Sequence, residues 1–122
     1  MRTIMISLFF LAGLVTGCNN RGYDSLSTKE FAAVIAEEDV QLIDTRTPEE
    51  FAEGHIPGAI NIDINSPDFD ERISSLDKSR RVAVYCRGGR RSKEAAERII
   101  VDGYEVVELN EGFISWEGDV ER

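Results

Sequence analysis

Cysteine and histidine are scarce in this chain. Two cysteines, Cys18 and Cys86, lie far apart among 122 residues, and His55 is the only histidine. No C-x-x-C pair is present, which argues against a dithiol redox protein that needs a resolving cysteine. No group of histidines and cysteines could hold zinc or iron, so we expect no metal site and no cofactor.

Positive charge is also in short supply. The sequence holds 14 lysines and arginines against 23 acidic residues, which gives a formal net charge of -9. An acidic surface of this kind argues against binding to nucleic acid or adhesion to anionic lipid. Against that background, four cations stand within seven residues of one cysteine: Arg87, Arg90, Arg91 and Lys93 follow Cys86.

A long hydrophobic run is missing as well. Residues 4–14 are largely apolar, but this stretch is too short for a comfortable membrane span. It follows Arg2 and ends in V-T-G-C at residues 15–18, which resembles a bacterial lipobox. We therefore expect residues 1–17 to be a lipoprotein signal peptide, and Cys18 to carry a lipid. The alternative is an ordinary secretory signal that contains a cysteine near its end.

The residues after the expected signal peptide divide into two parts. Residues 18–22 are expected to form a short polar tether, and residues 23–122 a single domain. The protein would be exported and anchored to a membrane, facing the periplasm or the cell exterior. If Cys18 is lipidated, Cys86 is the only free thiol and no internal disulfide is possible.

Apolar stretches of strand length alternate with stretches of helical periodicity in the domain. Strands are expected at residues 23–26, 40–43, 59–62, 81–85 and 105–109. This alternation predicts an α/β fold with a mainly parallel five-stranded sheet and helices on both faces.

Local signals mark the helix starts. Ser27 with Glu30, and Thr47 with Glu50, form capping-box patterns. We expect a further helix to begin at Ser66-Pro67, and the helix after residue 85 to have Ser92 as its N-cap. Residues 110–117 should form a closing turn or short helix.

Cys86 is expected at the carboxyl end of a strand and just before a helix, where α/β sheets bind ligands. A cysteine attacks as its thiolate, which nearby cations and helix N-termini favour. Gly88 and Gly89 let the backbone curl so that N–H groups converge on one point. The alternative is a small apolar cysteine at the end of a strand, which would not need this basic, glycine-rich setting.

Residues 86–92, C-R-G-G-R-R-S, resemble the active-site loop C-R-x-G-x-R-S of rhodanese-like sulfurtransferases. Residues 42–51 and 54–62 resemble a second family signature, and residues 112–116 a third near the end of the chain. The resemblance extends from Tyr23 to Trp116 and implies a rhodanese-like fold.

The resemblance also implies an activity. The Cys86 thiolate would take a sulfane sulfur from a small anionic donor such as thiosulfate, and pass it from a persulfide to a thiol or to cyanide. The loop from Arg87 to Ser92, which includes Gly88, Gly89, Arg90 and Arg91, would bind that substrate. Relatives specialised for thiosulfate carry a lysine at the position of Gly88, so the resemblance does not identify the sulfur donor. We expect a monomer.

Two other functions remain open. Related phosphatases and arsenate reductases have a loop one residue longer than the four residues between Cys86 and Arg91, so this loop should be too small for a tetrahedral oxyanion. The domain could also be a membrane-anchored sulfur carrier or binding module without enzymatic activity.

Three residues outside the loop have candidate roles. Asp44 and Arg46 are two positions apart at the end of a strand, and we interpret them as an ion pair that supports the loop. His55 could be a general base, but within the family signature it belongs to a structural turn, which we favour.

Overall fold

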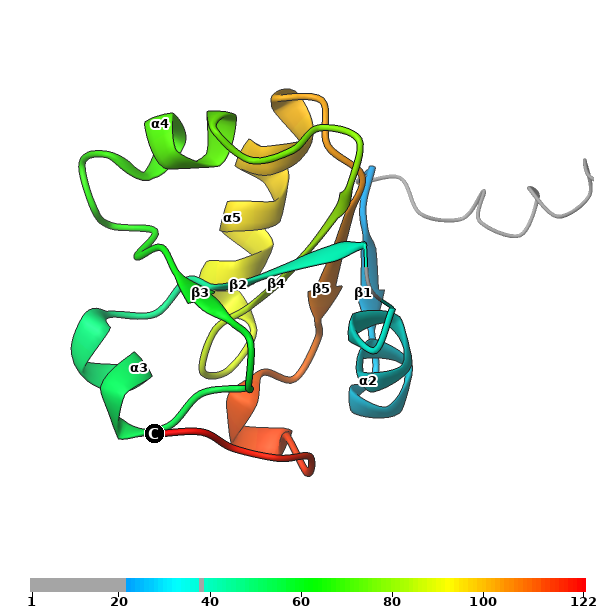
Figure 1. Cartoon of the computed structure of the whole chain (residues 1–122), viewed down its shortest axis with the longest axis vertical. Coiled ribbons are helices and arrows are strands. Elements are labelled where there is room, and N and C mark those ends of the chain that lie inside the picture. The colour runs from blue at the N-terminus through cyan, green and yellow to red at the C-terminus, as the bar shows by residue number, and fades with distance from the viewer. Residues whose placement is uncertain (1–21, 38) are drawn as a thin grey trace, which may run out of the picture.

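The computed structural model describes residues 22–37 and 39–122, so the expected signal peptide and Cys18 lie outside the described residues. The described chain forms one sheet of five strands in the order β1-β5-β4-β2-β3, and every pairing between them is parallel. Figure 1 shows helices on both sides of this sheet. The expected fold class is therefore confirmed.

The elements follow one another as predicted, with shifted ends. The strands are β1 (Asp24–Leu26), β2 (Val40–Asp44), β3 (Ile60–Asn61), β4 (Arg81–Tyr85) and β5 (Val106–Leu109). The helices are α2 (Thr28–Ile35), α3 (Pro48–Glu53), α4 (Phe69–Ser74), α5 (Arg90–Val101) and the 3₁₀ helix η1 (Phe113–Ser115).

Both capping boxes are confirmed. The Ser27 side chain accepts from the Glu30 backbone N–H while the Glu30 side chain accepts from the Ser27 N–H, and Thr47 and Glu50 do the same at α3.

The predicted starts of two helices are wrong. Helix α4 begins at Phe69 after Asp68, because the Ser66 hydroxyl is turned to Asp68 instead of capping a helix.

The second correction concerns α5. Its N-cap is Gly89 and not Ser92, because the left-handed backbone at Gly89 lets the helix begin two residues before Ser92. Ser92 is consequently a buried residue of the first turn, with its side chain free for another role.

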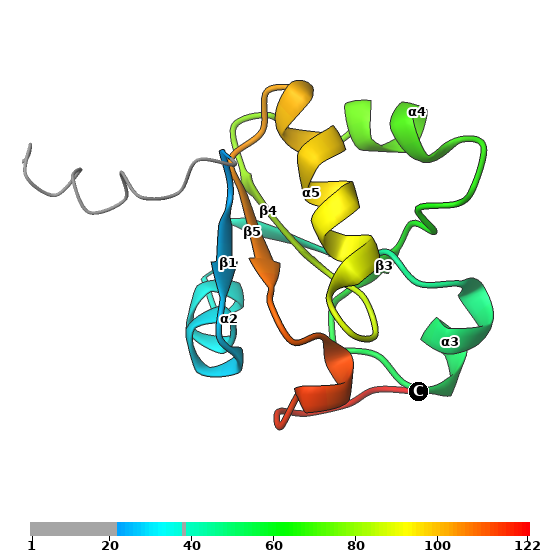
Figure 2. The ribbon, with the colours of Figure 1, turned by 180° about the vertical axis from the view of Figure 1, so that it is seen from behind.

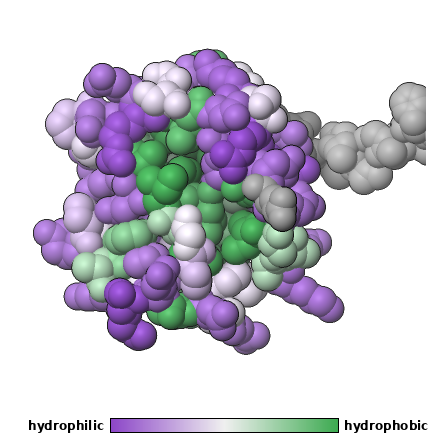
Figure 3. Space-filling model, viewed as in Figure 1, coloured by the Kyte–Doolittle hydropathy of each residue, from purple (hydrophilic) through white to green (hydrophobic). Residues whose placement is uncertain are grey.

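Alternation along β4 explains how the sheet separates two apolar cores. Val82 and Val84 point to the face covered by α4 and α5, whereas Ala83 and Tyr85 point to the face covered by α2. Figure 2 shows α5 lying across the first face. From the side seen in Figure 1, apolar side chains lie in the middle of the view inside a hydrophilic rim (Figure 3).

Candidate active site

The loop between β4 and α5 is the centre of the site. Cys86 directly follows the last residue of β4, and α5 begins four residues later at Arg90. Gly89 has a φ of 103°, and a Cβ on it would lie 2.2 Å from the carbonyl oxygen of Asn110. Only glycine fits this position. Gly88 is different, because a Cβ there would meet nothing within 4 Å.

The sulfur of Cys86 is held by the start of α5. Its side chain is buried, and Sγ accepts the backbone N–H groups of Gly89 at 3.1 Å and Ser92 at 3.3 Å. These are N–H groups that the first turn of a helix leaves without a partner in the helix, and the positive end of the helix dipole lies there too. The site therefore favours negative charge on Sγ.

The loop is fixed from its other side by η1. The N–H of Phe113 donates to the carbonyl of Cys86 at 2.8 Å, and that of Ile114 donates to the carbonyl of Arg87 at 3.0 Å. Gly112 has a φ of 79°, and a Cβ on it would lie 2.2 Å from the Arg87 carbonyl oxygen. The loop carbonyls are thus directed to η1 while N–H groups are directed to the sulfur.

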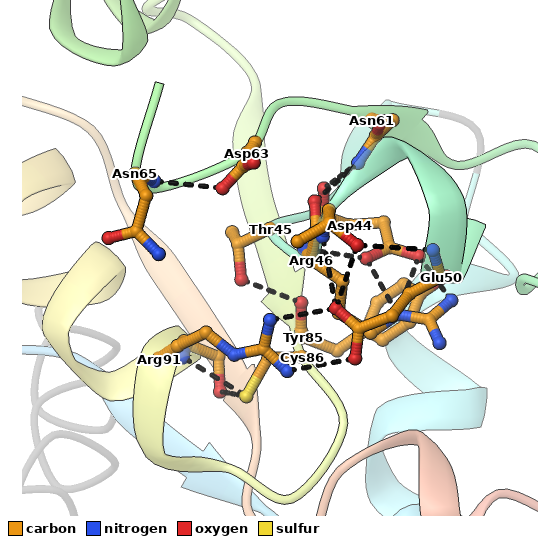
Figure 4. Close-up of polar contacts among 12 residues, drawn as sticks. Asp44, Thr45, Arg46, Glu50, Asn61, Asp63, Asn65, Tyr85, Cys86 and Arg91 are labelled. Atoms are coloured by element: carbon orange, nitrogen blue, oxygen red, sulfur yellow. Dashed lines mark hydrogen bonds and ion pairs between the residues drawn. The ribbon is translucent and has the colours of Figure 1, made fainter. Parts of the chain in front are cut away.

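The basic residues of the loop divide into two kinds. Arg91 forms an ion pair with Glu50 of α3, drawn in Figure 4, with Nη1 2.8 Å from Oε1. The hydrogen bond from Arg91 lowers the pKa of the Glu50 carboxyl to about 2. Arg87 and Arg90 are exposed, and neither has a side-chain ion pair within the described ranges.

A hollow of about 300 Å³ opens above the sulfur. It is lined by Cys86, Arg87, Gly88, Arg90 and Arg91. Since the charge of Arg91 is balanced by Glu50, the uncompensated positive charge in the hollow comes from Arg87 and Arg90. A small anion is the ligand that such a hollow can receive.

Asp44 and Arg46 form a buried ion pair with Arg46 Nη2 2.7 Å from Asp44 Oδ2. Arg46 also donates to the carbonyl of Gly54 at 2.7 Å, and its guanidinium lies 4.5 Å from the ring centre of Phe113. The pair, seen in Figure 4, therefore joins the end of β2 to the segment after α3 and to η1. Through η1 it supports the Cys86 loop from a distance.

His55 lies among structural contacts. Its ring stacks on Phe51 with centres 3.6 Å apart, and Nδ1 is 2.8 Å from the Phe51 carbonyl oxygen. Its Nε2 is 3.6 Å from a carboxylate oxygen of Glu121. These contacts fasten the C-terminal segment to the end of α3 and give His55 a structural role.

Two carboxylates of the site were not identified from the sequence. Glu50 was interpreted only as a member of a capping box, although it also pairs with Arg91. Glu108 is fully buried in β5, where its Oε2 accepts the Ser92 hydroxyl at 2.6 Å and lies 3.1 Å from Lys93 Nζ. The available signal for Glu108 was a single charged residue within an apolar strand.

Two kinds of feature are absent from residues 22–37 and 39–122. No helix there is long and apolar enough to cross a membrane. In the same residues, no group of three or more His, Cys, Asp or Glu side chains is arranged to hold a metal ion.

Comparison with known proteins identifies the family of this chain. Residues 27–119 match the family described as "Rhodanese-like domain". YtwF of Bacillus subtilis, provisionally named a sulfurtransferase, is 37% identical over 84 residues, which cover 69% of this chain and 80% of YtwF. A protein of Allochromatium vinosum named "Sulfurtransferase" is 41% identical over 80 residues, which cover 65% of this chain and 73% of that protein.

Longer proteins and a solved structure match as well. Proteins named tRNA uridine(34) hydroxylase, one of them from Bacillus cereus, are 33% identical over 101 residues; the match covers 79% of this chain but only 32% of theirs. A rhodanese-related protein from Thermoplasma volcanium superposes with a TM-score of 0.73 at 28% identity, covering 81% of this chain and 98% of that one.

Proposed function

Because this chain belongs to the family of rhodanese-like domains, we propose that it is a sulfurtransferase which carries sulfur as a persulfide on Cys86. The observation that carries this proposal is the position of Cys86 Sγ. It accepts two backbone N–H groups at the start of α5 and lies beneath a hollow with two uncompensated arginines.

The first half-reaction loads the sulfur. The Cys86 thiolate attacks the outer, sulfane sulfur of thiosulfate or a related donor and forms a new S–S bond. The S–S bond of the donor breaks, and sulfite leaves with its electron pair. Arg87 and Arg90 hold the anionic donor by charge-assisted hydrogen bonds, as their exposure in the hollow allows.

The second half-reaction unloads the sulfur. A thiolate or cyanide attacks the outer sulfur of the persulfide, and the electron pair of the broken S–S bond returns to Cys86. The N–H groups of Gly89 and Ser92 stabilise the thiolate that leaves. This two-step covalent scheme predicts ping-pong kinetics.

The competing proposal is hydrolysis of a phosphate or reduction of arsenate. The four residues between Cys86 and Arg91 form a shorter loop than those reactions use, and Arg91 is engaged with Glu50. The remaining alternative, a carrier that does not turn over, is weakened by the intact cysteine and its free arginines.

A kinetic assay separates these possibilities. The purified chain should convert thiosulfate and cyanide to thiocyanate, and should leave a generic aryl phosphate intact. Phosphatase turnover that disappears in Cys86→Ser would support the competing proposal instead. Sulfur loading without steady turnover would support the carrier.

We also propose where the protein acts. Residues 1–17 would direct export, a lipid on Cys18 would anchor the protein to a membrane, and the domain would act outside the cytoplasm as a monomer. The support is the lipobox-like segment at residues 15–18 and the presence of one further thiol, at Cys86.

A further inference from the structure

Glu108 is a buried carboxylate with a complete set of partners. Its side chain is fully buried in β5, between β1 and β4. Oε1 accepts the hydroxyl of Ser25 at 2.6 Å, and Oε2 accepts the hydroxyl of Ser92 at 2.6 Å and the Lys93 ammonium at 3.1 Å. A charge buried this deeply is costly unless it is paired, so its presence beside the site calls for a role.

Ser92 connects Glu108 to the reactive sulfur. A serine hydroxyl has one hydrogen, and that of Ser92 is given to Glu108. The oxygen of the same hydroxyl is 3.5 Å from Cys86 Sγ, where it can accept the thiol hydrogen but cannot donate to a thiolate. Ser92 thus gives the sulfur a backbone donor and a side-chain acceptor.

We propose that Glu108 is a positioning residue that acts on Cys86 through Ser92. It directs the Ser92 hydroxyl hydrogen away from the sulfur, and it places a buried negative charge behind that hydroxyl. Lys93 opposes this effect with a positive charge on the same carboxylate oxygen. Glu108 and Lys93 together influence how readily the Cys86 thiol ionises. The ease of ionisation in turn affects how well Cys86 acts as a nucleophile and how well it acts as a leaving group.

Other charged groups also face the sulfur. Arg91 of α5 interacts with it electrostatically and is paired with Glu50 of α3, while Asp63 acts on Arg91 from the segment after β3. Arg87 and Arg90 line the solvent-exposed hollow. Charges at that exposed side are screened by water and salt, whereas the effect of Glu108 is transmitted through the protein interior.

The experiment follows the alkylation rate of Cys86 by iodoacetamide as a function of pH, in a full chain carrying Cys18→Ser so that Cys86 is the only thiol. Three variants are compared with this parent: Glu108→Gln, Lys93→Met and the control Glu105→Gln. Glu105 also lies near β5, but its side chain is 73% exposed and pairs with Arg81. Its replacement removes the same charge without touching Ser92.

Glu108→Gln should move the alkylation midpoint to lower pH, because a like charge near a thiolate disfavours it. Lys93→Met should move the midpoint to higher pH, and Glu105→Gln should leave it in place. A Glu108→Gln profile that coincides with the parent, or that moves with Lys93→Met, would overturn the proposal. A purely structural role for Glu108 would change stability but not shift the two profiles in opposite directions.

If Glu108→Gln does not fold, which circular dichroism would reveal, a double variant provides the test. The double variant Glu108→Gln/Lys93→Met removes both charges of this partly buried ion pair, a change that proteins often tolerate better than the loss of one partner. It should cancel the upward shift of Lys93→Met; if the full upward shift persists, Glu108 has no influence on Cys86. The inference relies on the proposed function only for the choice of Cys86 as the reacting group. Alkylation does not involve sulfur transfer, so absence of thiocyanate formation would be a separate result.

Discussion

Arg91 of α5 and Glu50 of α3 form an ion pair through two contacts, with Nη1–Oε1 at 2.8 Å and Nη2–Oε2 at 3.1 Å. The contact holds α3 against the start of α5, the helix that follows the Cys86 loop. Both side chains are about one quarter exposed, at 27% and 26%. The pair is therefore accessible to protons while remaining close to Cys86.

The first prediction concerns stability at low pH. Arg91 lowers the pKa of Glu50 from 4.5 to about 2, so the folded state holds this carboxylate ionised more strongly than the unfolded state does. The stabilisation is fully present above about pH 4.5 and is lost as the pH falls towards 2. Urea unfolding of Glu50→Gln should show a weaker loss of stability over that interval than the wild type.

Glu49→Gln is the matched control, because Glu49 is the exposed neighbour in the same helix turn. It should retain the pH dependence of the wild type. If Glu50→Gln and Glu49→Gln lose stability in parallel with the wild type between pH 4.5 and 2, the ion pair does not contribute as the structure implies.

The second prediction concerns the arginines. Charge-assisted hydrogen bonds are worth on the order of 1.5–3 kcal/mol each. Arg87→Ala or Arg90→Ala should therefore lower kcat/KM for thiosulfate by roughly ten- to a hundredfold. Added salt should lower the wild-type value in the same direction, because exposed charges are screened. Arg80→Ala, before β4 and at the opposite end of the sheet, should have no such effect.

Arg91→Ala should also lower kcat/KM for thiosulfate. The reason differs from that for Arg87 and Arg90: the substitution leaves the Glu50 carboxylate unpaired near the hollow, where it repels an anionic donor. The double variant Arg91→Ala/Glu50→Gln should recover part of the loss. A triple variant with alanine at Arg87, Arg90 and Arg91 that keeps wild-type kinetics would disprove a role for these residues in donor binding.

Sequence reasoning predicted the parallel sheet, which the structure confirms, and placed Cys86 in a loop between a strand and a helix, because both features leave local signals. Alternating strands and helices gave the fold, and the residues from Cys86 to Ser92 gave the position of the site. Arg91 differs from Arg87 and Arg90 because its charge is paired with that of Glu50, which lies 41 positions away in the chain. No local pattern shows which cation a distant carboxylate will neutralise.

The start of α5 shows the same limit. Ser92 is a good N-cap residue, and the sequence pattern predicts that role for it. Gly89 takes the position instead, because its backbone has a positive φ and a Cβ there would collide with the carbonyl of Asn110. As a result, the Ser92 side chain contacts both Cys86 and Glu108.

The third prediction uses the two neighbouring glycines. Gly88 has open space where a Cβ would stand, so Gly88→Lys should fold and add a cation to the hollow. One added charge-assisted contact predicts a KM for thiosulfate lower by roughly tenfold. Steady-state kinetics over a range of thiosulfate concentrations would measure it, and an unchanged KM would show that the donor does not approach over Gly88.

Alanine at each glycine supplies the control. Gly88→Ala should match the wild type in stability, because a Cβ there meets nothing within 4 Å. Gly89→Ala should be destabilised by about 1–3 kcal/mol or more, because its backbone is left-handed and its Cβ would collide with Asn110. Equal unfolding midpoints for the two variants would contradict the loop geometry.

The fourth prediction concerns localisation. Cys18→Ser should release the protein from membranes, because the proposed anchor is a lipid on that residue. Stable anchoring needs more than one acyl chain, so the wild type should carry several. Fractionation with mass analysis of the wild type provides the comparison. A wild-type protein that is found in the soluble fraction with no acyl mass would rule out the anchor.

The central claim is that Cys86 itself carries the transferred sulfur. Intact-mass spectrometry of the Cys18→Ser chain after treatment with thiosulfate tests it most directly, because the persulfide is a covalent intermediate. The mass should rise by one sulfur atom, return to its original value after cyanide is added, and stay unchanged throughout in the Cys18→Ser/Cys86→Ser double variant. No mass gain in a folded protein, or an equal gain when Cys86 is replaced, would contradict sulfur transfer through this residue.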